Sequence, residues 1–225
     1  MSAIAERYRK VLREVADAAD VAGRDPAEIT VIAVTKTVGV SEVRQAIAAG
    51  LHDFGENRAP EFTGKQGLFP AERWHFIGTL QTNKVKQVAG RATLIHSVDS
   101  AGLLEAVDRR AREAGVVQPI LLQVNVSGEL SKHGMTFEEA EDAVRQAGDL
   151  PGVLIRGLMT MAPLGRPESA RWVFRDCADW MGRLQSLHCD AVDLTELSMG
   201  MSNDFGVAIE EGATIVRVGR ALFGR

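Results

Sequence analysis

The chain has 225 residues, of which 45% are hydrophobic and 25% are charged, and its formal net charge is −4 at pH 7. This composition is typical of a globular protein that buries a substantial core. The small negative charge gives no basic footprint for nucleic acid, and no apolar run approaches the length of a membrane span. We therefore expect neither a nucleic-acid partner nor a membrane partner.

The N-terminal residues predict a charged amphipathic helix over Ala3–Ala22, which Gly23 ends. This segment lacks the apolar centre of a secretory signal. Cys177 and Cys189 have neither a CxxC partner nor metal-ligand spacing, and they fit a reduced intracellular protein. We expect a cytoplasmic protein in which both cysteines are packing residues and no metal is bound.

Short apolar runs alternate with helical segments through the rest of the chain, and several read as continuous apolar sequence, as buried parallel strands do. The expected strands are Thr30–Lys36, Leu51–Gly55, Trp74–Gly78, Leu94–Val98, Pro119–Val126, Val153–Met161, Glu196–Met199 and Thr214–Val218. The expected helices are Ser41–Ala49, Ala59–Gln66, Thr82–Ala89, Ser100–Ala114, Phe137–Ala147, Glu168–Leu187 and Asp204–Glu211.

Eight strands that alternate with helices, without a linker or a composition break, predict one α/β domain over residues 1–225. They suit a single (β/α)8 TIM-type barrel with an extra N-terminal helix. An open doubly wound sheet is the competing architecture. It normally has a glycine-rich turn after its first strand, and none follows Thr30–Lys36. We therefore expect the barrel.

Lys36 closes the first apolar run, so its ammonium group lies where the expected strand leaves the core. Burial at this point would lower the pKa of the amine and expose a neutral nucleophile, which can form a Schiff base with a carbonyl compound. The alternative is a lysine whose stem covers apolar surface while its amine points into solvent.

In such a barrel, chemistry belongs at the carboxyl ends of the strands. Several polar residues fall at those ends, and each has a structural alternative. Asn57 could be a turn residue, His75 a core histidine with its hydrogen bonds made, and Asn125 a capping side chain. Their shared location favours a ligand site, which also includes Met159 and Arg217.

The segments after the last two expected strands are Ser198–Ser202 and Gly219–Arg220. Barrels commonly build a phosphate site from these two loops. Glycine lets backbone N–H groups approach an anion, Ser198 or Ser202 can donate a hydroxyl, and Arg220 can add charge-assisted hydrogen bonds. The alternative is that glycine merely ends short strands.

Because a barrel closes between its eighth and first strands, the Lys36 amine and this anion site should be neighbours. An aldehyde that carries a phosphate would bridge them, and both pyridoxal 5′-phosphate (PLP) and a sugar phosphate aldehyde fit. Arg217 is costly on a strand without a partner. Facing a pyridine nitrogen, it would leave that nitrogen unprotonated and weaken the cofactor as an electron sink. An outward-facing arginine paired with a helix carboxylate is the alternative.

Specific motifs occur along nearly the whole chain. They are AVTKT at 33–37, FGEN at 54–57, WHFIGTLQTNK at 74–84, SVDS at 97–100, LLQVNVSGELSKHG at 121–134, GLMTMAP at 157–163, LSMGMSNDF at 197–205 and AIEEGATIVRVGRALFG at 208–224. Together they resemble the pyridoxal phosphate homeostasis protein family, which is similar to the barrel half of alanine racemase. The sequence departs from the family pattern at Arg58-Ala59-Pro60 and at Val38-Gly39, near the expected mouth of the pocket.

The resemblance implies a PLP-binding protein of intracellular PLP homeostasis, with Lys36 as the Schiff-base lysine. It implies PLP-dependent apoenzymes as candidate partners. Arg217 would approach the pyridine nitrogen. The phosphate loops would contain Ser198, Gly200, Gly219 and Arg220, and the pocket would be lined by Asn57, His75, Asn125 and Met159.

Catalysis would need a second acid/base group opposite the lysine, which alanine racemases take from a tyrosine of an additional C-terminal domain. Here the printed sequence ends at Arg225, soon after the eighth expected strand, and its one tyrosine is Tyr8. We therefore expect a monomeric carrier or regulator without strong catalytic activity. The alternatives are a weak PLP-dependent amino-acid racemase that uses His75 or Lys84 as its second base, and a Schiff-base aldolase.

Overall fold

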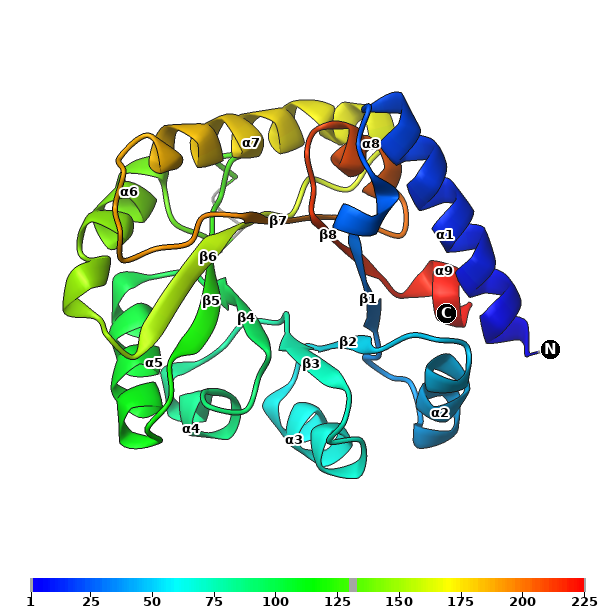
Figure 1. Ribbon diagram of the computed structural model, residues 1–225, viewed down its shortest axis with the longest axis horizontal. Coiled ribbons are helices and arrows are strands. Elements are labelled where there is room, and N and C mark those ends of the chain that lie inside the picture. The colour runs from blue at the N-terminus through cyan, green and yellow to red at the C-terminus, as the bar shows by residue number, and fades with distance from the viewer. Residues whose placement is uncertain (1, 130–132, 225) are drawn as a thin grey trace.

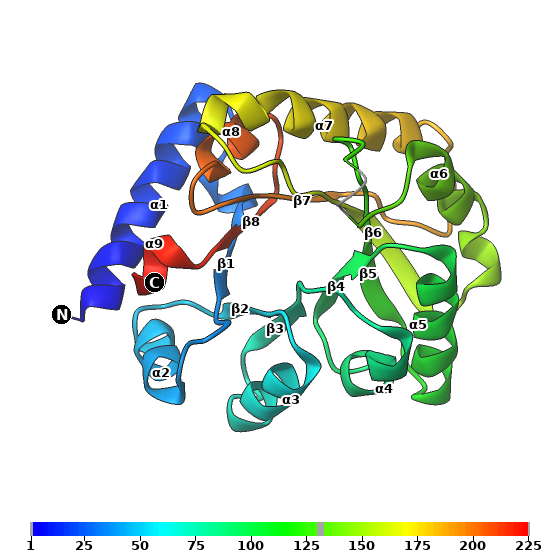
Figure 2. The same cartoon turned by 180° about the vertical axis from the view of Figure 1, so that it is seen from behind.

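Strands in the computed structural model, which describes residues 2–129 and 133–224, form a closed parallel barrel. Within these residues eight strands follow one another around the barrel in chain order, and helices surround them (Figures 1 and 2). The expected (β/α)8 barrel is therefore confirmed. Residues 130–132 of the motif at 121–134 lie outside the described residues.

The observed strands agree with the expected ones to within a few residues. They are β1 Thr30–Val34, β2 Asp53–Glu56, β3 Arg73–Phe76, β4 Leu94–Val98, β5 Gln118–Gln123, β6 Val153–Met159, β7 Glu196–Met201 and β8 Ile215–Val218. The helices are α1 Ala3–Val21, α2 Val40–Ala48, α3 Ala59–Leu68, α4 Val85–Val88, α5 Ala101–Glu113, α6 Phe137–Arg145, α7 Arg171–Gln185, α8 Phe205–Glu210 and α9 Arg220–Phe223.

Two differences at strand ends matter for the site. β1 ends at Val34, so Lys36 lies in a turn beyond it. β7 continues to Met201, so most of the expected turn at 198–202 is strand. β7 pairs with β8 through Ser198 and then, after a register shift, through Met201. β7 thus has one extra residue here, which curves the strand without ending it.

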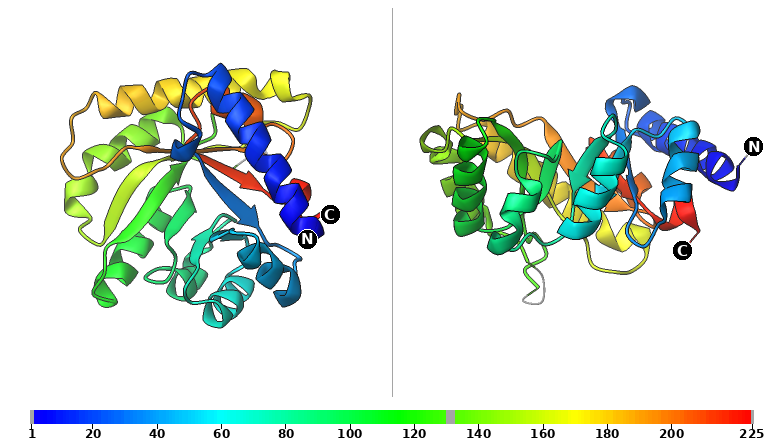
Figure 3. Two further views of the ribbon diagram at one scale, coloured as in Figure 1. Left: turned by 45° about the vertical axis from the view of Figure 1, so that its right-hand side comes forward. Right: turned by 90° about the horizontal axis from the view of Figure 1, so that it is seen from below.

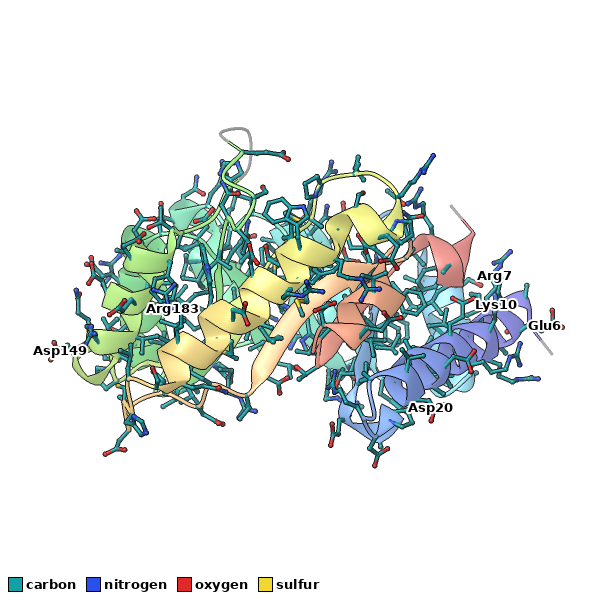
Figure 4. All side chains as sticks on the ribbon, turned by 90° about the horizontal axis from the view of Figure 1, so that it is seen from above. Glu6, Arg7, Lys10, Asp20, Asp149 and Arg183 are labelled. Atoms are coloured by element: carbon teal, nitrogen blue, oxygen red, sulfur yellow. The ribbon has the colours of Figure 1, made fainter. Side chains whose placement is uncertain are left out.

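The extra N-terminal helix, α1, lies outside the ring of barrel helices and packs against α8 and α9 (Figure 3, left). Ser2 caps it, since its hydroxyl accepts the Ala5 N–H at 3.2 Å. Its buried side chains recur on one face, while Glu6 and Lys10 project from the opposite face into solvent (Figure 4). The buried face consists of Ile4, Val11, Val15, Ala18 and Ala19.

Apolar residues fill two separate regions. The larger core lies between the strands and the surrounding helices. The smaller one contains side chains from β1, β4, β5, β6 and β8, which can meet only inside the barrel: Ile32, Leu94, Leu121, Met159 and Ile215. The interior is thus packed, as in other barrels of this type. Among the described residues, no helix combines the length and the apolar character needed to cross a membrane.

Gly157 in β6 has φ of +148°, and a Cβ there would lie 1.9 Å from the Glu196 carbonyl oxygen of β7. We expect Gly157→Ala to lower the free energy of unfolding by about 2–4 kcal/mol, because it adds both backbone strain and overpacking.

Urea denaturation of the purified variants measures this effect. Gly182→Ala is the matched control, because Gly182 lies within α7 and a Cβ there meets nothing within 4 Å. Alanine should stabilise the helix by up to about 1 kcal/mol at such a position. Equal stability of Gly157→Ala and wild type would contradict the proposed clash.

Candidate functional site

A cavity of about 780 Å³ opens among loops at the carboxyl ends of the strands, a volume typical of small-molecule sites. The loop that follows β6 extends from this face of the barrel (Figure 3, right). Five of the ten residues expected at the site line the cavity: Lys36, Asn57, Arg217, Gly219 and Arg220. The structure thus brings together the lysine, the arginine and the loop after β8.

Lys36 is exposed to solvent within this cavity. The expectation that a strand end buries its amine is wrong, because β1 ends two residues earlier and the chain then turns. The Val38 N–H donates to the Thr35 carbonyl at 2.9 Å, and Thr37 has φ of +64°. This is the position at which a type II turn prefers glycine, so a β-branched residue there is strained by about 1–3 kcal/mol. The strain holds Lys36 at the tip of a fixed turn.

A buried ion pair supports the turn from below. Lys65 of α3 donates to Glu56 Oε1 at 2.5 Å and to the Thr35 carbonyl at 2.7 Å. Thr35 donates its hydroxyl to the same carboxylate oxygen at 2.6 Å. Glu56 and Thr35 are fully buried, and the Lys65 side chain is 12% exposed. The ion pair therefore fixes the residue directly before Lys36.

The loop after β8 presents backbone N–H groups to the cavity. Those of Gly219 and Ala221 both donate to the Ser202 hydroxyl oxygen, at 3.1 and 3.3 Å. Arg220 lies beside them on the cavity wall. A phosphate oxygen is an acceptor of the same kind, so two amides, a hydroxyl and a guanidinium here have the chemistry needed to bind an anion. Of the two serines that the sequence left open, Ser202 is the one at this site.

Ser198 and Gly200, both expected in the phosphate loops, have other contacts. The fully buried Ser198 hydroxyl is hydrogen-bonded to Arg217 and to His96 inside the barrel. Gly200 has φ of +88°, and a Cβ there would lie 2.6 Å from the Cβ of Ala208. Its glycine is required by the packing of α8 against β7, and neither residue lines the cavity.

Three residues expected around the ligand also lie away from the cavity. Met159 belongs to the apolar cluster inside the barrel. Asn125 holds the loop after β5, since its amide donates to the Glu129 carbonyl at 3.0 Å and accepts from Ser127. The His75 ring, 4% exposed, lies between His96 and Asp53. These contacts match the structural alternatives given above, in which Asn125 is a capping side chain and His75 is a core histidine with its hydrogen bonds made.

Arg217 faces into the barrel and is 4% exposed, so the alternative of an outward-facing arginine is wrong. Its Nη1 donates to the Ser198 carbonyl at 2.8 Å and to Oγ at 2.5 Å, and its Nη2 donates to the Thr160 carbonyl at 2.9 Å. These acceptors are neutral. Burial lowers the pKa of Arg217 to about 10, against the opposing effects of Asp204 and Cys177, so the guanidinium stays charged at neutral pH. The Arg217 guanidinium is thus a buried cation on the cavity wall, and its remaining N–H groups are free to donate to a ligand.

Asn57 contributes a hydrogen-bond acceptor, its side-chain Oδ1, which is buried and has no hydrogen-bond partner among the described residues. Gly78 of the neighbouring loop lies so close that a Cβ there would be 2.3 Å from the Asn57 carbonyl oxygen. The sequence signal for this contact is the glycine that directly follows His75-Phe76-Ile77. Ser202 also had a sequence signal, since it lies in the segment that follows the seventh expected strand. Nothing in the sequence distinguishes Asp204, which also lines the cavity.

Comparison with known proteins places the chain in a family. The family model described as "Alanine racemase, N-terminal domain" matches residues 9–225. A pyridoxal phosphate homeostasis protein of Aquifex aeolicus is 43% identical over 222 residues, covering 97% of this chain and 96% of the relative. The corresponding Escherichia coli K12 protein is 35% identical over 232 residues, covering 100% and 97%. The chain belongs to the pyridoxal phosphate homeostasis protein family.

Solved structures agree with this assignment. PipY of Synechococcus elongatus, whose structure is described with PLP bound, superposes with a TM-score of 0.84 at 38% identity, covering 98% of this chain and all of that one. An alanine racemase of Streptomyces coelicolor gives a TM-score of 0.71 at 17% identity, covering 95% of this chain and 57% of that one. The second likeness shows the shared barrel fold alone.

Removing the Lys65 ammonium should leave the Glu56 carboxylate buried without its cation. We expect Lys65→Met to lower the free energy of unfolding by about 3 kcal/mol, and Glu56→Gln in the same chain to restore part of the loss. Urea denaturation of the single and double variants measures both the loss of unfolding free energy and its recovery. Arg145→Met is the control, since the exposed Arg145–Glu141 pair of α6 should contribute less than about 0.5 kcal/mol.

Asp53 predicts a pH effect on stability. Burial would raise its pKa, but hydrogen bonds from His75 and Arg73, aided by the charge of Arg73, hold the pKa at about 2. Since this is below the ordinary value of 3.8, the stabilisation is present above about pH 4 and is lost as the pH falls towards 2. We expect Asp53→Asn to lack this increment, so that its stability and that of the wild type converge between pH 4 and 2 in thermal melts. A constant difference across that range would contradict the ionisation of Asp53.

Proposed function

We propose that this chain binds PLP in the cavity and acts in PLP homeostasis as a carrier or regulator. One observation carries the proposal: Lys36, Arg217 and the amides of the Gly219 loop line a single cavity. They come from opposite ends of the sequence, and closure of the barrel brings them together. PipY, which is 38% identical and is described with PLP bound, supports the same ligand.

The residues present fit the chemical features of PLP. Its phosphate matches the anion site of Ser202, Gly219, Ala221 and Arg220. Its unprotonated pyridine nitrogen is a neutral acceptor, which suits the spare N–H donors of Arg217. Asn57 lies on the wall of the same cavity.

PLP supplies an aldehyde that condenses with an amine. We propose that the Lys36 Nζ is this amine and holds PLP as a Schiff base. The strained turn at Thr37 and the Lys65–Glu56 pair below it hold the lysine in place. Arg217 would hold the pyridine nitrogen in its neutral form, which limits carbanion chemistry at the bound ligand.

The residues considered from the sequence as a second base for a racemase lie away from the main cavity. Tyr8 lies on α1, and burial together with the charge of Asp53 raises its pKa. His75 is inside the barrel, and Lys84 lines a smaller neighbouring hollow. None of the three is among the residues that line the main cavity. We therefore favour the carrier over the racemase and the aldolase, and assays of amino-acid racemisation and of aldol cleavage test the alternatives.

We further propose one PLP-binding barrel domain over residues 1–225 that acts as a monomer in the cytoplasm. It would pass PLP to PLP-dependent apoenzymes, without a nucleic-acid partner. Light scattering after size-exclusion chromatography tests the monomer. Recovery of activity by a purified apoenzyme mixed with the loaded protein tests the transfer.

Lys36→Ala should abolish a covalent adduct while leaving weaker PLP binding through the anion site. The measurement is the visible absorption of the protein with PLP, followed by borohydride reduction and peptide mass mapping. Wild type should carry the pyridoxyl mass on the peptide that contains Lys36.

Lys84→Ala is the matched control and should keep the adduct, because Lys84 lines only the neighbouring hollow. An adduct of equal yield on another lysine of Lys36→Ala would contradict the assignment. Complete loss of PLP binding by Lys36→Ala would contradict the separate anion site.

A further inference from the structure

A continuous chain of hydrogen bonds crosses the inside of the barrel beneath the cavity. Arg217 Nη1 donates to Ser198 Oγ at 2.5 Å, and this oxygen lies 2.9 Å from His96 Nδ1. His96 Nε2 lies 3.1 Å from His75 Nδ1, and His75 Nε2 lies 3.2 Å from Asp53 Oδ1. The five residues come from β8, β7, β4, β3 and β2. Asp53 is the first residue of its strand, so the chain runs from the cavity to the base of the barrel.

Chemistry at both ends fixes the direction of these hydrogen bonds. Arginine only donates, so Ser198 Oγ accepts from Arg217. Among the described residues the buried hydroxyl has only one other partner, His96 Nδ1, so its hydrogen points there. An ionised carboxylate only accepts, so His75 must carry its hydrogen on Nε2, facing Asp53. With both rings neutral, His75 Nδ1 then accepts from His96 Nε2–H. The two ends independently require the same tautomer of both histidines.

The surroundings agree with a neutral His96 ring. His96 is fully buried, and burial, with the charge of Arg217, moves its pKa well below the usual value. Asp53 is ionised and forms an ion pair with Arg73 of β3. It also interacts electrostatically with Tyr8 of α1. Asp204, which follows β7, and Cys177 of α7 both act to raise the pKa of Arg217, against the larger effect of its burial. Polarised bonds in a low-dielectric interior strengthen one another.

We propose that His96 and Ser198 are positioning residues for Arg217, which they hold towards the cavity through a one-directional hydrogen-bond chain anchored on His75 and Asp53. While His96 takes the serine hydrogen, the hydroxyl oxygen turns its lone pairs towards the guanidinium. The remaining Arg217 N–H groups are thereby left for the ligand. This role rests on the proposed PLP site, and it names residues that do not touch that site.

The tautomers can be measured on the full-length wild-type protein without any ligand. Long-range proton–nitrogen correlation spectra of the uniformly ¹⁵N-labelled protein distinguish protonated from unprotonated ring nitrogens. Single His→Gln variants assign the five histidines. We expect both His75 and His96 as neutral rings with hydrogen on Nε2 at pH 7.5. A hydrogen on Nδ1 of either ring, or a doubly protonated His75, would overturn the fixed direction.

The positioning role is tested by a pair of substitutions. A glutamine at position 96 can accept from Ser198 through its oxygen and donate to His75 through its nitrogen, whereas leucine can do neither. We expect His96→Leu to weaken PLP binding about tenfold, the effect of one lost charge-assisted hydrogen bond, and to shift the absorption band of bound PLP. His96→Gln should keep both properties near the wild-type values.

His52→Gln is the control, since His52 is exposed and paired with Glu72. Melting temperatures separate a general loss of stability from a change at the ligand. Equal affinity and spectrum in wild type and a folded His96→Leu would overturn the proposal. If His96→Leu does not fold, the tautomers of the wild type decide. Failure of the wild type to bind PLP would refute the proposed function and leave the tautomer test intact.

Discussion

The first and last strands of the barrel pair along four residues, Thr30–Ala33 with Ile215–Val218. The site depends on this pairing. It places the turn after β1, which carries Lys36, beside the loop after β8, which carries the amides of Gly219 and Ala221. These groups are separated by most of the sequence, and neither loop alone carries both an amine and a set of anion-binding donors. Barrel closure thus brings the amine and those donors to one cavity.

A second constraint is the charge inside the barrel. Buried guanidinium groups are tolerated only when their donors find acceptors. Arg217 finds carbonyls and a hydroxyl, so all of its observed hydrogen-bond partners are neutral. The nearest anion in its hydrogen-bond chain, Asp53, lies at the other end of the strands. The interior is therefore divided into an apolar cluster and a polar chain, and the polar chain leads to the cavity floor.

The exposure of Lys36 changes the account of its reactivity. The sequence suggested that the protein itself would desolvate this amine, but the structure leaves it open to water. What the fold supplies is position: a buried ion pair, a buried threonine and a strained turn fix the backbone on both sides of the lysine. Exclusion of water would then have to come from the ligand that fills the cavity.

Much of the fold could be predicted because each strand and each helix has its own period. Continuous apolar runs such as Val31–Val34 predicted buried parallel strands, and glycines at helix ends predicted where the chain turns. The same reasoning found Lys36, Arg217, Gly219 and Arg220, which lie at strand ends, where a barrel places its chemistry. Residues at strand ends are predictable in this way because their location follows from the order of elements.

The direction in which a side chain points from its strand could not be predicted in the same way. Ser198 and Ser202 are four residues apart in one motif, yet the first faces the barrel interior and the second meets the amides of the cavity. The register shift between Ser198 and Met201 separates them, and it arises from how β7 pairs with its neighbours. His75 and Met159 likewise point inside the barrel, below the cavity. The sequence by itself determined the order of strands and the loops that carry the chemistry. Only the tertiary structure decided which side chains face the cavity, because the direction of a side chain depends on strand register across the closed sheet.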